Sequence, residues 1–247
     1  MRKPLLAALF AAWMPLAMAD DITVSAAASL TNAFRDIAEA FERAHPEHRV
    51  QLNFAGSGAL LQQLARGAPV DVFASADQIS MDQAEQQELL TADSRRDFVS
   101  NSLVLITPTG GEPIQQLDDL LRPEFERIAV SNPASVPAGR YSRDALDDAQ
   151  LWAPLQDSII RTQNVRQSLD YVARNEVDAG FVYATDAALM ADRVRVQLQV
   201  ATPEPIRYPV AITADGAKNP ASALFLDFLF TEPGQQALSR YGFGPAD

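Results

Sequence analysis

Cysteine is absent from the 247 residues. Its absence excludes disulfides, thiolate catalysis and a lipid anchor on a lipobox cysteine. A chain of this length does not need disulfides, because it can bury a sizeable apolar core without them. Histidine is also scarce, since the sequence contains only His45 and His48, on either side of Pro46 and Glu47. Both lie at the polar end of an expected helix, where exposure to solvent is a better explanation than catalysis.

Basic residues are few relative to acidic ones. The chain has 20 Lys and Arg against 32 Asp and Glu, which gives a net charge of −12. This balance argues against binding to nucleic acid, which requires a basic face, and against adsorption to anionic lipid. If the ligand is an anion, the field of the whole protein repels it, so local dipoles must provide the attraction.

Long apolar runs are absent beyond the N-terminus. The first 19 residues combine basic Arg2 and Lys3 with an apolar stretch at 5–16 and the small-x-small sequence of residues 17–19. This pattern is typical of a cleavable secretory signal, and we expect 1–19 to be removed and the protein to act in the periplasm. A membrane anchor is the alternative, but a span needs roughly 20 apolar residues. Loss of Arg2 and Lys3 would leave 18 basic residues against 32 acidic ones.

Short apolar segments alternate with helical periodicity along the rest of the chain. Residues 22–26 read as a strand, and the apolar spacing over 30–41 predicts a helix with one buried face and Ser29 as its N-cap. We expect 103–106, 128–130 and 180–183 to be buried parallel strands. Further strands are expected at 50–54, 70–74, 194–200 and 208–212, and helices at 60–64, 117–121, 141–149, 167–173, 221–230 and 234–241. The alternation predicts an α/β fold, and the length favours two lobes of about 100 residues each.

Four strand-to-helix junctions are candidate binding elements. The carboxyl ends of strands are where α/β sheets bind ligands, and helix N-termini there attract anions. The junctions are Ala26-Ala27-Ala28-Ser29, Gly56-Ser57-Gly58, Asn132 to Tyr141 and Asn164-Val165-Arg166. Each has a simpler explanation when taken alone: a helix cap at Ser29, a tight turn at Gly56–Gly58, a surface or salt-bridge residue at Arg166. Tyr183, at a strand end, is similarly explained by packing.

Taken in order, these strings resemble the periplasmic molybdate-binding proteins of ABC transporters. The matching segments cover essentially the whole chain after residue 19. They are 26–33 (AAASLTNA), 54–58 (FAGSG), 71–77 (DVFASAD), 101–104 (NSLV), 136–141 (VPAGRY), 164–166 (NVR), 178–183 (DAGFVY) and 240–243 (RYGF).

The resemblance implies a two-lobed type II periplasmic-binding fold, in which each lobe has a mainly parallel sheet flanked by helices and the ligand lies in the cleft between them. It places one lobe at 20–101 plus 205–247 and the other at 102–204. The ligand-binding residues of the family fall on Ser29 and Ser57 (hydroxyl and backbone N–H), Ala138 and Val165 (backbone N–H) and Tyr183 (hydroxyl). They would bind the molybdate oxyanion through hydrogen bonds, without direct coordination of the metal. Many relatives have more serines at the second motif, whereas here only Ser57 can supply a hydroxyl.

A site of neutral donors suits a fully ionised dianion, because each charge-assisted hydrogen bond contributes about 1.5–3 kcal/mol. It contains no carboxylate to accept the proton of a protonated phosphate, whose O–H would stay unpaired, and polar mismatch of this kind gives strong rejection. Sulfate would be excluded by size alone, and tungstate would not be excluded. The resemblance therefore implies a monomer without cofactor that captures molybdate, and tungstate, for delivery to the membrane permease of an ABC importer.

Two other classes of function and one other ligand class remain as alternatives. An enzyme is disfavoured, because Gly56-Ser57-Gly58 is not a nucleophile elbow. The scattered acidic residues Asp71, Asp77, Asp178 and Asp186 are better explained by capping than by a metal site. A sensing module would require a DNA-binding helix pair, which the sequence lacks. Sulfate or a small organic acid is the alternative ligand, and a carboxylate would call for Arg140 or Arg166 in the cleft.

Overall fold

The computed structural model describes residues 20–246. The predicted signal peptide, residues 1–19, lies outside this range. No helix within 20–246 has the length and apolar character that a membrane span requires.

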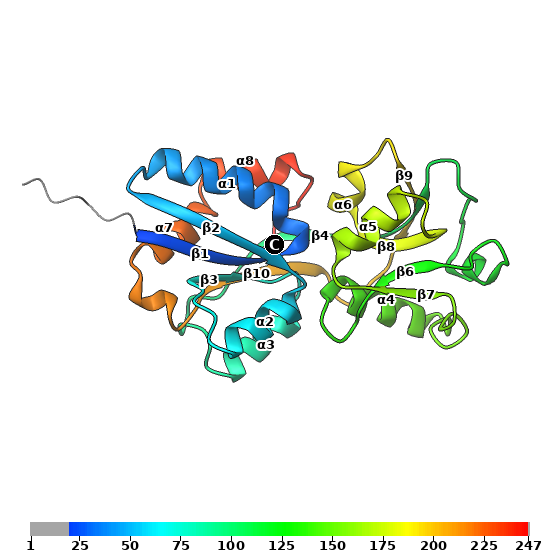
Figure 1. Ribbon diagram of the computed structural model, residues 1–247, viewed down its shortest axis with the longest axis horizontal. Coiled ribbons are helices and arrows are strands. Elements are labelled where there is room, and N and C mark those ends of the chain that lie inside the picture. The colour runs from blue at the N-terminus through cyan, green and yellow to red at the C-terminus, as the bar shows by residue number, and fades with distance from the viewer. Residues whose placement is uncertain (1–19, 247) are drawn as a thin grey trace, which may run out of the picture.

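The chain forms two lobes side by side, each built on a five-stranded sheet (Figure 1). The sheet of the first lobe has the strand order β2-β1-β3-β10-β4, and that of the second lobe has the order β7-β6-β8-β5-β9. The strands are β1 (Asp20–Ala27), β2 (His48–Ala55), β3 (Val72–Ala74), β4 (Arg96–Asn101), β5 (Leu103–Pro108), β6 (Ile128–Ser131), β7 (Ile159–Thr162), β8 (Ala179–Tyr183), β9 (Val194–Val200) and β10 (Ile206–Ile212). The predicted two-lobed α/β class is confirmed.

Each sheet combines parallel and antiparallel pairs. β1 pairs in parallel with β2 and β3, and β6 does so with β7 and β8. β10 is antiparallel to β3 and β4, and β5 is antiparallel to β8 and β9. The prediction that 103–106 is a parallel strand is therefore wrong. β5 enters the second sheet from the first lobe, one residue after β4, and lies between β8 and β9 with the opposite direction to both.

Helices flank both sheets, and local sequence explains where several of them begin and end. Helix α1 buries one face and ends at Ala44, two residues before Pro46. Asp77 and Asn164 cap α3 and α5 with their side chains, and Pro137 is the first residue of α4. The helices are α1 (Thr31–Ala44), α2 (Ser57–Ala65), α3 (Gln78–Gln86), α4 (Pro137–Asp148), α5 (Val165–Ala173), α6 (Ala184–Leu189), α7 (Ala221–Phe228) and α8 (Glu232–Arg240), with 3-10 turns η1 (Ala28–Leu30), η2 (Leu117–Leu121) and η3 (Gly216–Lys218).

The chain passes between the lobes twice, from β4 to β5 and from β9 to β10. In Figure 1 these are the connections at the middle of the molecule, between the blue and orange half and the green and yellow half. This arrangement sets the carboxyl ends of β1 and β2 in the first lobe opposite the N-termini of α4 and α5 in the second. Gly58 N–H donates to the Ser135 carbonyl across this interface, at 2.9 Å. A Cβ at Gly58 would lie 2.8 Å from the same oxygen, so the close approach of the lobes requires glycine there.

Candidate functional site

The five residues predicted to bind the ligand surround one cavity between the lobes. The cavity comprises about 200 Å³ of empty space, part of which is open to solvent. Its lining comprises Ala27, Ala28, Ser29, Ala55, Gly56, Ser57, Ala76, Val136, Pro137, Ala138, Asn164, Val165 and Tyr183. None of the five predicted residues is more than 3% exposed. A polar ligand in this cavity would be shielded from water, which strengthens its hydrogen bonds to the protein.

Three helices begin at the cavity wall. Ser57 and Val165 are the first residues of α2 and α5, and Ala138 is the second residue of α4. The backbone N–H groups of a first helical turn have no acceptor within the helix, and the helix dipole adds positive potential at the same end. The cavity therefore offers an anion the local attraction that the acidic protein as a whole does not provide.

The two serine hydroxyls at the cavity are held by contacts within the first lobe. Ser57 Oγ accepts a hydrogen bond from Ala76 N–H at 3.0 Å. Ser29 Oγ lies 3.0 Å from the hydroxyl of Tyr208 on β10. The prediction that Ser29 caps the following helix is wrong, because Ser29 lies inside the 3-10 turn η1 and Leu30 occupies the cap position of α1. The turn leaves the Ser29 side chain free to contact Tyr208.

Tyr183 ends β8 and presents a hydroxyl that lacks a partner. The residue is 1% exposed, and among the described residues its hydroxyl has no hydrogen-bond partner. Its ring packs edge-on against Tyr208, with 5.7 Å between the ring centroids. Burial raises the pKa of both tyrosines well above the ordinary value, so both hydroxyls keep their protons at neutral pH. A buried donor without an acceptor costs about 1–3 kcal/mol, and a bound acceptor would remove this cost.

The two arginines considered as carboxylate ligands are both engaged by protein groups. Arg140 on α4 donates to Asp77 of the first lobe through Nε at 2.8 Å and through Nη2 at 2.5 Å, and Nη2 also contacts Ser80. Neither Arg140 nor Arg166 is among the residues that line the cavity.

Arg166 on α5 likewise connects the two lobes. Its Nε donates to Asp186 of its own lobe at 2.5 Å. Its other nitrogens donate to Asn32 Oδ1 at 2.7 Å and to the carbonyl oxygen of Ser29 at 3.0 Å. Burial raises the pKa of the Asp186 carboxyl, while the Arg166 charge opposes that shift. Arg166 was predicted to be a surface or salt-bridge residue, and the structure shows the salt bridge, to Asp186.

The scattered acidic residues have structural roles. Asp71 and Asp178 accept hydrogen bonds from the backbone N–H groups of Thr23 and Arg127. Asp77 caps α3, and Asp186 accepts from Tyr183 N–H. Within residues 20–246, no three His, Asp or Glu side chains are grouped so as to hold a metal ion.

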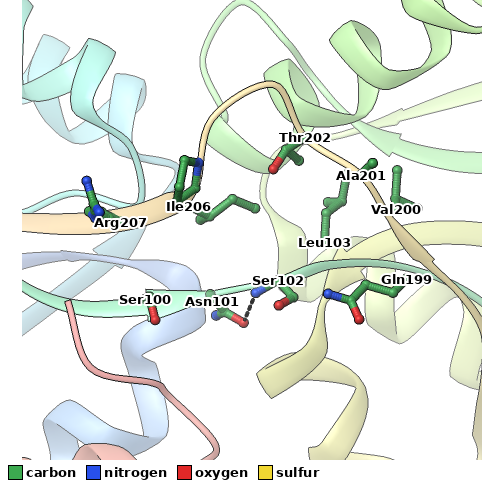
Figure 2. Close-up of a pocket in the computed structure, with 11 residues that line it drawn as sticks. Ser100, Asn101, Ser102, Leu103, Gln199, Val200, Ala201, Thr202, Ile206 and Arg207 are labelled. Carbon is green, nitrogen blue, oxygen red and sulfur yellow. Dashed lines mark hydrogen bonds between the residues drawn. The ribbon is translucent and has the colours of Figure 1, made fainter. Parts of the chain in front are cut away.

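A second, larger cavity lies between the two chain segments that connect the lobes (Figure 2). It is an open groove with about 1030 Å³ of empty space, lined by residues 100–103, 199–202 and 205–207. It contains none of the five predicted binding residues and no helix N-terminus. We therefore assign the candidate site to the smaller cavity, where donors from both lobes converge.

Two lobes closed over a buried, donor-lined cavity define the class of two-lobed solute-binding proteins. The chain belongs to the family described as bacterial extracellular solute-binding protein, which matches residues 22–244.

Three individual similarities extend over most of the chain. The molybdate-binding protein ModA of Escherichia coli K12 is 36% identical over 238 residues, covering 92% of this chain and 91% of the relative. A putative ABC transporter substrate-binding lipoprotein, YvgL of Bacillus subtilis, is 34% identical and covers 90% and 85%. Among solved structures, the substrate-binding domain of a putative molybdenum ABC transporter from Clostridium difficile aligns with a TM-score of 0.69 at 32% identity, covering 92% of this chain and 99% of that one.

Proposed function

We propose that this protein captures molybdate, and tungstate, in the periplasm and delivers it to the membrane permease of an ABC importer. The observation that carries the proposal is the cavity between the lobes, in which buried donors from both lobes converge without an acidic side chain in the lining. The names of the relatives from E. coli and C. difficile support the choice of molybdate. The proposed role requires binding and release but no bond-breaking step, so it assigns no catalytic residue.

The proposed contacts are hydrogen bonds to the four oxygens of the anion. Ser29 and Ser57 would donate from the first lobe, and Ala138 N–H, Val165 N–H and the Tyr183 hydroxyl from the second. Because the anion would contact both lobes at once, it would favour the closed state over the open one. We assign the lobes to 20–101 plus 205–247 and to 102–204, and we expect the protein to work as a monomer without a cofactor.

The arginine contacts weigh against a small organic acid as the ligand. A carboxylate in a buried site normally pairs with a cation, and both candidate arginines already bind Asp77 and Asp186. Sulfate remains the stronger alternative, because it is a dianion without protons and only the size of the cavity can exclude it. Tungstate, which nearly matches molybdate in size, should bind.

Calorimetric titration with molybdate, tungstate, sulfate and phosphate tests the proposal, on the chain that begins at Asp20. We expect tight binding of the first two anions and no measurable binding of the others. Replacement of both Ser29 and Ser57 with alanine should weaken molybdate binding by about 1–3 kcal/mol for each serine, whereas Ser239→Ala on the surface of α8 should leave it unchanged. If sulfate binds as tightly as molybdate, the size of the cavity does not exclude sulfate. If none of the four anions binds, the proposal is contradicted.

A further inference from the structure

The direction of the hydrogen bond between Ser29 and Tyr208 decides what Ser29 can offer a ligand. Either hydroxyl could be the donor at the observed 3.0 Å. If Tyr208 donates, the Ser29 proton is free to point into the cavity. If Ser29 donates, its lone pairs face the cavity instead and repel the oxygens of an anion.

Asn101, at the end of β4, settles this direction. Its Oδ1 accepts from the backbone N–H of Ser102 at 2.9 Å, as Figure 2 shows. A backbone N–H can only donate, so the other side-chain atom of Asn101 must be the amide nitrogen. That nitrogen lies 3.2 Å from the Tyr208 hydroxyl and 2.9 Å from Thr185 Oγ1, and it donates to both.

Tyr208 must therefore donate the hydrogen bond that joins its hydroxyl to Ser29 Oγ. The tyrosine is completely buried, and within residues 20–246 its hydroxyl contacts only Asn101 and Ser29. Asn101 Nδ2 offers no acceptor, which leaves Ser29 Oγ as the acceptor for the Tyr208 proton. The alternative would leave a buried hydroxyl proton without a partner.

The other serine of the cavity is held in the same way. Ser57 Oγ accepts from Ala76 N–H, which can only donate. Both serine oxygens thus receive a hydrogen bond from the protein, and both serine protons are left for the ligand.

We propose that Tyr208 and Asn101 are positioning residues that make Ser29 a hydrogen-bond donor, and that this relay determines the selection of unprotonated oxyanions. The proposal rests on the proposed oxyanion-binding function and adds the origin of its specificity. An oxyanion that carries a proton, such as arsenate or phosphate at neutral pH, meets a donor at each serine. A serine can accept the O–H of such an anion only through its remaining lone pair, with its own proton turned away from the ligand. Molybdate, which is unprotonated, finds donors only.

The first test compares molybdate with arsenate, a tetrahedral oxyanion that keeps a proton at neutral pH and is closer to molybdate in size than phosphate is. Calorimetry gives the molybdate dissociation constant, and displacement of molybdate gives that of arsenate. Tyr208→Phe keeps the ring that packs on Tyr183 but removes the proton donated to Ser29. We expect molybdate to bind about tenfold more weakly to this variant. We expect the preference for molybdate over arsenate to fall by about tenfold or more, because the arsenate O–H then replaces the hydrogen bond that Ser29 Oγ accepted from Tyr208. The matched control is Tyr241→Phe, whose hydroxyl binds Asp36 away from the cavity.

The second test reverses the relay. Asn101→Asp replaces the donor with an acceptor, so Tyr208 would donate to the new carboxylate and Ser29 would donate to Tyr208. The added charge also repels the anion, and the same substitution in the Tyr208→Phe background measures this repulsion alone. We expect the loss of molybdate affinity caused by Asn101→Asp to be about tenfold or more larger when Tyr208 is present.

The outcomes separate this proposal from the proposed function. If the parent fails to bind molybdate, the function itself is contradicted. If the parent binds molybdate but Tyr208→Phe keeps its preference over arsenate, or if Asn101→Asp has the same effect in both backgrounds, the relay is overturned and the function stands. If Tyr208 had only a structural role, Tyr208→Phe would weaken the binding of both anions equally and leave the preference for molybdate unchanged.

Discussion

The Tyr183 hydroxyl is the group at this site whose environment most clearly requires a ligand. It is buried, protonated and without a partner among the described residues. In the closed protein without ligand, that unpaired donor would carry a cost that favours opening. An oxyanion in the cavity would satisfy the hydroxyl and favour closure. Under the proposed function, this single side chain would link ligand binding to the closure of the two lobes.

Tyr183→Phe should therefore have two effects of opposite sign. Molybdate should bind about 10- to 100-fold more weakly, because a charge-assisted hydrogen bond is lost. Without ligand, the variant should populate the closed state more than the parent, because closure no longer buries an unpaired hydroxyl. Calorimetry measures the first effect, and the radius of gyration from X-ray scattering of the ligand-free protein measures the second. An unchanged affinity would remove Tyr183 from the site.

At the scale of secondary-structure elements, α4 of the second lobe is tied to the start of α3 in the first. Arg140 binds Asp77, which is 2% exposed and also caps α3. Opening of the cleft would separate this pair and hydrate both charges. The contact therefore stabilises the closed state without touching the ligand.

Arg140→Ala should weaken molybdate binding by about 10- to 100-fold, because closure would then bury Asp77 without its partner. The substitution should mainly increase the dissociation rate of molybdate, since the contact exists only after the lobes close. Arg143→Ala is the matched control, because Arg143 lies on the same helix and pairs with Asp147 at an exposed i,i+4 position. Stopped-flow fluorescence with the two variants measures the rates. Equal dissociation rates for Arg140→Ala and the parent would show that this contact does not hold the cleft closed.

The sequence predicts those helices whose positions depend on residues close to one another in the chain. The apolar spacing of α1 and the capping role of Asp77 at α3 both depend on residues close in sequence, and the structure has each of them. The direction of β5 was not predictable in this way, because a strand buried on both faces has the same pattern in either orientation.

The contacts that organise the site join distant parts of the chain. Tyr208 reaches Ser29 across 179 positions, and Arg140 reaches Asp77 across 63. Residues 208–212 were recognisable as a strand, but no local pattern indicates which of its side chains reaches the cavity. Resemblance to a family gave the five cavity residues, whereas Tyr208, Asn101 and the partners of both arginines required the structure.

At the scale of the whole molecule, the net charge of the protein and the electrostatics of the cavity have opposite effects on an anion. The chain carries a net charge of −12, whereas the cavity is lined by neutral donors. Attraction by helix N-termini acts at short range, so added salt should screen the overall repulsion while leaving the buried contacts intact.

Molybdate affinity should be nearly constant from about pH 7 to about pH 9.5, since burial raises the pKa of Tyr183 and Tyr208 above the ordinary value of 10.0. The same shifts affect stability. The unfolded chain releases these protons near pH 10 and the folded chain only at higher pH, so their contribution to folding is complete below pH 10 and is lost as pH rises further. Denaturant titrations from pH 7 to pH 11 measure the free energy of unfolding. A decline in affinity between pH 7 and pH 9 would show that one of the donors titrates in that range.

The central claim is that an oxyanion lies between the two lobes, held by donors from both. The most direct measurement is the crystal structure of the molybdate complex, with anomalous scattering recorded at the molybdenum absorption edge. We predict one strong anomalous peak in the cavity, with the anion oxygens within hydrogen-bond distance of Ser29, Ser57, Ala138, Val165 and Tyr183. A peak in the groove between the connecting segments, or no peak in crystals grown with saturating molybdate, would contradict the claim.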